Sequence, residues 1–191
     1  MTPTHLPGRV AIPSLPEQTR TPPPPDALEA FNAAPADAVR RTLLTCLHSP
    51  RWADRLADHR PYPDVESLLA ASDEAAYDLM PGDLAQALAG ETLPVLPTDV
   101  YGAAHTALSA ASAAYEARFG HAFVICVDGL PPNEALDQAL AGIRSRLTND
   151  PEEERVLAAE ELRRLARGRL VEVLRGAGNC ATSHNEPASG R

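Results

Sequence analysis

The stretch that decides the fold reads AYEARFGHAFVICV and covers residues 114–127. Its first part continues a helical pattern that begins at Thr98 or Asp99, and Gly120 is a typical residue at a helix end. Its second part, residues 122–127, is short, apolar and rich in β-branched side chains, which favours a buried extended segment. A long helix followed by one buried extended segment therefore stands at the centre of the chain.

Helical patterns dominate the sequence on both sides of this stretch. Apolar residues recur every three or four positions, and prolines or acidic residues stand where first turns begin. The predicted helices cover residues 27–31, 35–47, 50–60, 64–79, 83–89, 99–119, 131–147 and 151–174. We therefore predict an all-α, single-domain helical bundle of seven to eight helices with one short extended segment.

The two ends of the chain differ in composition from its middle. Residues 1–26 include the run Thr21–Pro25, and such proline-rich text favours extended conformations that bury no core. The residues that follow Gly176 are mostly small or polar. We predict a disordered Pro-rich arm at 1–26, a helical domain at 27–175 and a flexible tail at 176–191.

Charge and composition exclude several classes of partner. The net charge is −9, from 17 basic and 26 acidic residues, which repels phosphate backbones, so we expect no nucleic-acid partner. No apolar run approaches the roughly 20 residues of a membrane helix, and the N-terminus has no secretory pattern. We expect no membrane partner and a cytoplasmic location.

The cysteines are Cys46, Cys126 and Cys180. Their wide spacing gives no zinc pattern, and Cys46 and Cys126 stand in apolar surroundings typical of buried, unreactive thiols. The sequence also lacks a glycine-rich loop of the kind that cradles phosphates. We expect no metal and no organic cofactor.

Four stretches of the sequence, taken together, resemble one known family. They are residues 31–33 with 46–53 and 60–62, residues 114–126, residues 146–152, and the closing helix with Glu160, Glu161, Arg169 and Leu170. In order and spacing they are similar to the 2-oxo-4-hydroxy-4-carboxy-5-ureidoimidazoline decarboxylases of urate breakdown, over residues 28–175. The resemblance implies an all-α fold, a homodimer and a cofactor-free decarboxylation that yields (S)-allantoin.

The catalytic motifs of that family are missing from this chain. Family members use a His in a His-Pro-x-Ile-Gly motif and a Glu in a Ser-x-x-Glu-Gln motif, together with an Arg. Here residues 90–94 read Gly-Glu-Thr-Leu-Pro, so Glu91 stands nearest to the His position, and residues 98–102 replace the second motif. The resemblance implies that Arg146 is the substrate-binding Arg.

The resemblance also implies that the extended segment lines the substrate pocket with backbone groups, from Phe123, Val124 and Ile125. We expect Arg146 to project toward a cavity that touches this segment and the 90–102 loop. An Arg at this position can fork onto a carboxylate or ureido oxygen, or it can be an ordinary solvated helix cation.

Glu91 and His105 are the candidates for proton transfer. Loss of CO2 leaves a carbanion that a positioned acid must protonate on one face. Glu91 fits this role if it is buried in the pocket, and is otherwise an exposed loop carboxylate. His105, one turn after Tyr101, either points into the pocket or is a surface or core histidine. Asp99 and Tyr101 can exchange hydrogen bonds at the pocket mouth.

Two hypotheses about function follow. The first, which we favour, is a decarboxylase-like lyase with a rebuilt site that acts on a small polar carboxylated or ureido-type substrate, for instance in a tailoring step of secondary metabolism. The second is a non-catalytic binding or accessory protein on the same scaffold. Converging polar side chains in a pocket favour the enzyme, and a closed or apolar pocket favours the accessory protein.

Overall fold

Eight α-helices follow one another in the computed structural model, which describes residues 26–92 and 102–182, and no strand occurs within these ranges. The helices are α1 (Ala27–Ala33), α2 (Ala36–Cys46), α3 (Pro50–Asp58), α4 (Val65–Tyr77), α5 (Pro81–Ala89), α6 (Gly102–Phe119), α7 (Pro132–Arg146) and α8 (Pro151–Thr182). These elements confirm the predicted all-α bundle. None of the described helices combines the length and apolar character needed to cross a membrane.

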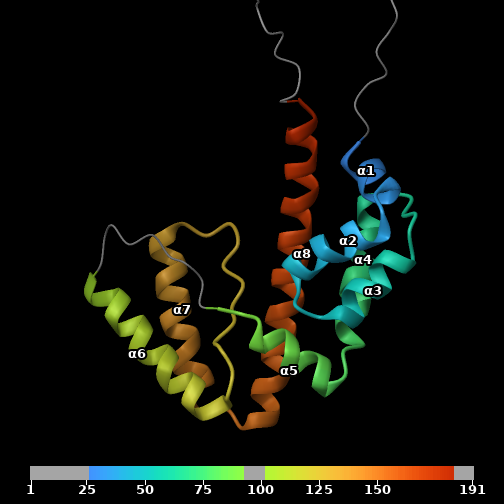
Figure 1. Cartoon of the computed structure of the whole chain (residues 1–191). Helices are drawn as coiled ribbons and strands as arrows, with labels where there is room; N and C mark the ends of the chain where they lie inside the picture. Colours follow the sequence, from blue (N-terminus) through green and yellow to red (C-terminus); the bar gives the residue numbers. More distant parts are fainter. Residues whose placement is uncertain (1–25, 93–101, 183–191) are drawn as a thin grey trace, which may run out of the picture.

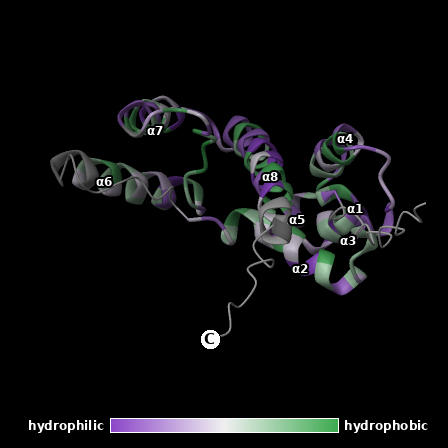
Figure 2. Cartoon of the chain, turned by 90° about the horizontal axis from the view of Figure 1, so that it is seen from above, coloured by the Kyte–Doolittle hydropathy of each residue, from purple (hydrophilic) through white to green (hydrophobic). Residues whose placement is uncertain are grey.

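Helix α8 is the axis of the molecule (Figure 1). It continues to Thr182, past Gly176, where the sequence predicted the start of a tail. Helices α1, α2 and α4 pack against α8. Seen from above, α6 and α7 lie to one side of α8 and α1–α4 to the other (Figure 2).

The extended segment separates two hydrophobic cores. The larger core combines α1–α5 with α8 and includes Val124, whereas the smaller core joins α6 and α7 and includes Phe123 and Ile125. Successive side chains of an extended chain point to opposite sides. Val124 therefore enters one core while its two neighbours enter the other, and all three are buried.

Several helices begin or end at the residues that the sequence offered. The Asp64 carboxylate accepts a hydrogen bond of 2.7 Å from the backbone N–H of Ser67, which caps the start of α4. Gly120 follows the last residue of α6 with a φ of 77°, a left-handed conformation that costs glycine little. These local signals fix where the chain changes direction.

Residues of the first family-like stretch hold the end of α1. The Asn32 side chain donates to the carbonyl of Tyr62 and accepts from its N–H, both at 2.9 Å. Arg60 donates to the carbonyls of Phe31 and Ala34, both at 2.8 Å, where the helix end leaves carbonyl groups unpaired. The residues of this stretch therefore stabilise the helical fold.

Candidate functional site

Glu91 lies just beyond the end of α5 and is buried, with 8% of its surface exposed. Its two carboxylate oxygens accept hydrogen bonds of 2.8 and 2.7 Å from Nη1 and Nη2 of Arg169 on α8. This is the forked geometry that makes arginine–carboxylate pairs strong. The hydrogen bond to Glu91 raises the pKa of Arg169, so its guanidinium stays charged.

Arg169 also connects α8 to the end of α2. Its Nη1 donates to the carbonyl of Cys46 at 3.0 Å. The Arg169 side chain is still 36% exposed, so it also reaches solvent. Burial raises the pKa of the neighbouring Cys46 thiol, which keeps that thiol protonated and a poor nucleophile.

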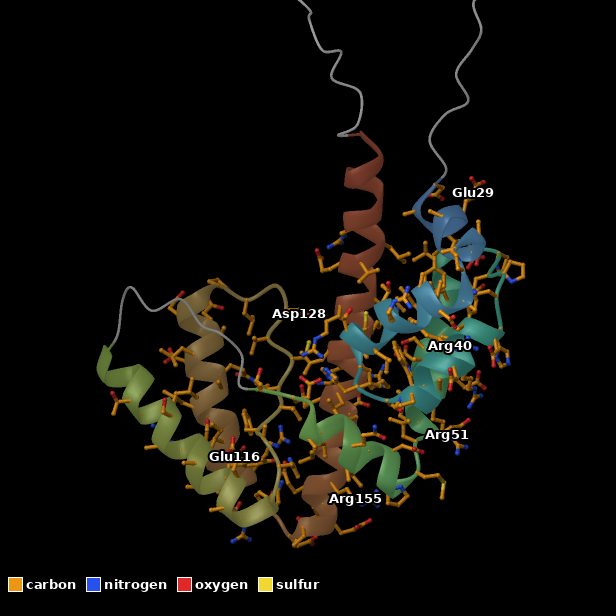
Figure 3. All side chains as sticks on the ribbon, viewed as in Figure 1. Glu29, Arg40, Arg51, Glu116, Asp128 and Arg155 are labelled. Atoms are coloured by element: carbon orange, nitrogen blue, oxygen red, sulfur yellow. The ribbon has the colours of Figure 1, made fainter. Side chains whose placement is uncertain are left out.

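Asp128 approaches α8 beside Arg169. A Cβ atom added to Gly168 would lie 2.1 Å from Oδ2 of Asp128, so the carboxylate rests where another residue would place its side chain. Asp128 is labelled in Figure 3, on the loop that leads away from the extended segment. Its negative charge also raises the pKa of Arg169.

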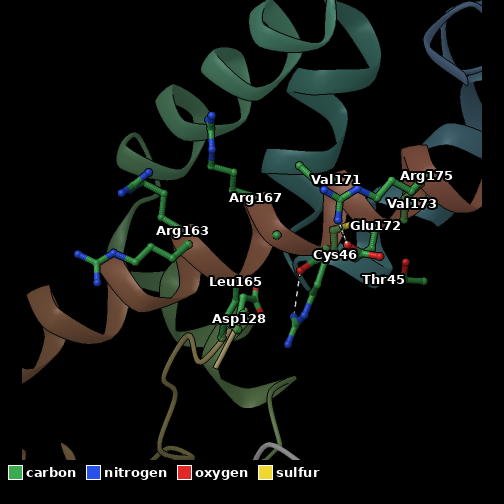
Figure 4. Close-up of a pocket in the computed structure, with 14 residues that line it drawn as sticks. Thr45, Cys46, Asp128, Arg163, Leu165, Arg167, Val171, Glu172, Val173 and Arg175 are labelled. Carbon is green, nitrogen blue, oxygen red and sulfur yellow. Dashed lines mark hydrogen bonds and ion pairs between the residues drawn. The ribbon is translucent and has the colours of Figure 1, made fainter. Parts of the chain in front are cut away.

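Cys46, Asp128 and Arg169 line a groove with a volume of about 1060 Å³ (Figure 4), whereas Glu91 lies behind Arg169 and is not part of the lining. Thr45 and Cys46 line one wall, Asp128 and Gly129 another, and α8 supplies the floor from Arg163 to Arg175. Two smaller described cavities, of about 250 and 200 Å³, lie against α5 and the first part of α8. The largest of the three is lined by several arginines, of which Arg163 and Arg167 point away from Asp128 (Figure 4) and pair with Asp73.

Arg146 is engaged inside the protein. Its Nε donates to Oε1 of Glu154 at 2.8 Å and its Nη1 donates to the carbonyl of Val124 at 2.7 Å. Its guanidinium lies over the Phe123 ring, 4.7 Å from the centroid, which is a favourable cation–π distance. The side chain of Arg146 is 9% exposed.

Glu154 is the partner that explains this burial. It is fully buried and accepts hydrogen bonds from Arg146, from the Tyr115 hydroxyl and, at 3.0 Å, from the Asn149 amide. Burial and the hydrogen bond to Glu154 raise the pKa of Tyr115. A buried carboxylate is tolerated when it is paired and hydrogen-bonded in this way.

The extended segment runs along α8 and meets it at three points in order. Val124 is joined to Glu154 through Arg146, the N–H of Cys126 donates to Oε2 of Glu161 at 2.7 Å, and Asp128 rests on Gly168. Hydrogen bonds at Val124 and Cys126 thus connect the backbone of the segment to α8, and the side chain of Asp128 packs against Gly168.

The structure brings only some of the predicted site residues together. Arg146 contacts the segment that contains Phe123, Val124 and Ile125, but it lines none of the three described cavities. Glu91 pairs with Arg169, a residue for which the sequence predicted no site role.

The remaining predicted site residues cannot be placed at either cluster. Asp99 and Tyr101 lie outside the described residues, and His105 belongs to α6 with a side chain outside the described part. The site roles assigned from the sequence thus stay predictions. The sequence predicted no site role for Asp128 or Arg169, although both line the groove and Arg169 stands in the fourth family-like stretch.

A metal centre finds no support in the part of the chain that the structure describes. Over residues 26–92 and 102–182, no group of three or more His, Cys, Asp or Glu side chains could hold a metal ion.

A protein-family model described as OHCU decarboxylase, the abbreviation of the ureidoimidazoline decarboxylase introduced above, matches residues 32–92 and 98–171. The chain belongs to the OHCU decarboxylase family. The match covers Glu91, the Arg146 network and most of the Arg169 groove, whose lining continues beyond residue 171 to Arg175.

One solved structure, described as the crystal structure of (S)-allantoin synthase, has the same fold as this member of the OHCU decarboxylase family. It superposes with a TM-score of 0.61 at 19% sequence identity, covering 76% of this chain and 53% of that chain. The chain thus spans about half the length of that protein. No curated protein sequence matched the chain.

Proposed function

We propose that the chain is a cofactor-free, decarboxylase-like lyase whose site is rebuilt around Arg169 and Glu91 and takes a small polar carboxylated or ureido-type molecule. One observation carries this proposal. A buried carboxylate forks onto an arginine at the border of the groove, at the point where the resemblance locates the family's catalytic His.

The chemistry suits such a site because Arg169 has unused donor capacity. Its Nη1 and Nη2 serve Glu91, and Nη1 also serves Cys46. Its exposed part can donate to a carbonyl or carboxylate oxygen of a ligand and stabilise negative charge that develops there. Glu91 holds the guanidinium in place, while proton transfer by Glu91 or His105 remains part of the proposal.

A specific observation favours the second candidate, a non-catalytic binding or accessory protein. The side chains of Glu91 and Arg146 are only 3% and 9% exposed, and both are paired within the protein. A group enclosed in this way holds the fold more readily than it exchanges protons with a ligand.

A turnover assay separates the two candidates. The parent chain is offered OHCU, made in place from urate, and a panel of small ureido compounds with and without a carboxylate, and their consumption is followed by chromatography. Arg169→Met should lower turnover by about 100-fold or more, the scale of losing one donor to a developing oxyanion. Arg175→Ala is the matched control, because Arg175 lines the same groove with a 70% exposed side chain.

If the parent binds a panel compound without consuming it, the accessory protein is the better description. Equal turnover by the parent and Arg169→Met would remove Arg169 from the site. Two further elements of the proposal have separate checks. A homodimer would appear in light scattering as twice the mass of 20.3 kDa, and a biosynthetic gene neighbourhood would support a tailoring step in secondary metabolism.

A further inference from the structure

The fork between Arg169 and Glu91 is the geometry with which proteins hold a free carboxylate. Each guanidinium nitrogen of Arg169 faces its own oxygen of Glu91, at 2.8 and 2.7 Å. Such bidentate contacts are both strong and specific for planar anions. The chain therefore builds a carboxylate site and fills it with its own residue.

The Arg169–Glu91 pair connects three helices. Glu91 follows α5, Arg169 stands on α8, and the Cys46 carbonyl at the end of α2 accepts from the same Nη1 that serves Glu91. The Glu91 side chain is 3% exposed. A free carboxylate would have to displace a buried and well-oriented group.

The charges around Arg169 also disfavour a further anion. Glu91 neutralises the guanidinium, and the Asp128 carboxylate lies beside it over Gly168. A ligand carboxylate placed there would be the third around one positive charge, and like charges at close range repel.

The rest of the groove offers no compensating excess of positive charge in its described lining. Each further arginine there has a carboxylate partner: Arg163 and Arg167 pair with Asp73, Arg164 pairs with Glu160 and Glu161, and Arg175 pairs with Glu172. The groove is rich in arginine but is electrostatically balanced.

We propose that Glu91 sets the charge class of the ligand: it occupies the carboxylate-binding face of Arg169, so the ligand meets this part of the groove with an uncharged ureido- or amide-type group. The proposal rests on the proposed function and narrows it, because it assigns an uncharged ureido or amide group, and not a carboxylate, to the part of the ligand that faces Arg169. Glu91 does not itself line the groove, so it determines specificity through Arg169, which does.

Anion binding tests this directly. Acetate and formate are titrated by calorimetry and thermal shift, at constant ionic strength set with chloride, against the parent, Glu91→Ala, Glu91→Gln and the control Glu172→Ala. Glu91→Ala should bind acetate at least about tenfold more tightly than the parent, because the freed guanidinium forks onto the added carboxylate. The melting temperature of this variant should rise with acetate in a saturable way, whereas the parent and Glu172→Ala should respond to acetate as they do to chloride.

Two results would overturn the proposal. One is acetate-specific stabilisation of the parent, which would show that Arg169 accepts an outside carboxylate despite Glu91. The other is a folded Glu91→Ala that binds acetate no better than the parent. Glu91→Gln keeps the shape of the side chain without its charge, which gives a second variant in case Glu91→Ala does not fold. If neither variant folds, the acetate titration of the parent alone decides whether Arg169 accepts an outside carboxylate. Failure of the proposed function is distinguishable, since it shows as absent turnover and not as acetate binding.

Discussion

Replacing Arg146 by alanine should destabilise the protein strongly. The substitution leaves Glu154 fully buried without its cation and leaves the Val124 carbonyl without its 2.7 Å donor. It also removes the guanidinium from the Phe123 ring. Stranding one partner of a buried ion pair costs about 3–5 kcal/mol, out of a total stability of roughly 5–15 kcal/mol.

Urea unfolding measures this loss. With an m-value of roughly 2 kcal/mol/M, a cost of about 3–5 kcal/mol moves the unfolding midpoint down by about 2 M. Arg175→Ala is the control, because the side chain of Arg175 is 70% exposed and its surface pair with Glu172 should be worth no more than about 0.5 kcal/mol. Arg146→Lys should fall between the two, since an ammonium keeps the charge and loses the fork.

A double variant shows whether the stranded carboxylate is the cause. Combining Arg146→Ala with Glu154→Gln removes both charges, so part of the single variant's loss should be recovered. The reasoning is refuted if Arg146→Ala costs no more than Arg175→Ala. In that case Arg146 would be free to serve a ligand, as the resemblance first implied.

Three smaller predictions concern single residues. Gly90→Ala should cost about 1–3 kcal/mol in thermal unfolding, because the added Cβ would lie 2.5 Å from Cγ of His48, and His48→Ala should relieve that cost in a double variant. The pKa of Glu160 is lowered from 4.5 to about 2, chiefly by the hydrogen bond from Arg163, so the stability that Glu160 adds is complete above pH 4.5 and is lost as pH falls toward 2. In an acid titration, Glu160→Gln should therefore lose less folding stability than the parent, by up to about 1 kcal/mol because the pair lies near the surface. Cys46 should react with iodoacetamide on the order of 100-fold more slowly in the folded than in the urea-unfolded chain, as mass spectrometry of the labelled peptides would show, because its thiol is buried and its pKa is raised.

The helical scaffold could be predicted because its signals are local. A cap such as Asp64 and a terminator such as Gly120 act within one helical turn, so the sequence around them is enough to place helix ends. The continuation of α8 to Thr182 was not predicted. Gly176 suggested an end there, but a single glycine inside a helix costs only about 1 kcal/mol, which neighbouring residues can offset.

The extended segment shows what local signals leave open. Its apolar, β-branched text predicted a buried strand-like conformation, and the structure buries Phe123, Val124 and Ile125. The sequence of the segment does not predict that it separates two hydrophobic cores, with Val124 in one core and its two neighbours in the other. That information resides in helices that lie before and after it in the chain.

The two arginines of the family-like stretches explain why the site was harder to predict than the scaffold. Arg146 and Arg169 both stand on helices, within stretches that carry the family resemblance, and each pairs with a glutamate. Arg146 finds Glu154 eight residues away, whereas Arg169 finds Glu91 across 78 residues of sequence. Their side chains end up 9% and 36% exposed.

Helical periodicity describes both positions equally well, because it carries no information on which glutamate the fold brings near. A residue is available to a ligand only if the fold leaves part of it unpaired, and that depends on contacts such as the one between Arg169 and the end of α2. The groove beside Arg169, and the prediction that Glu91 controls what enters it, therefore follow from the tertiary structure.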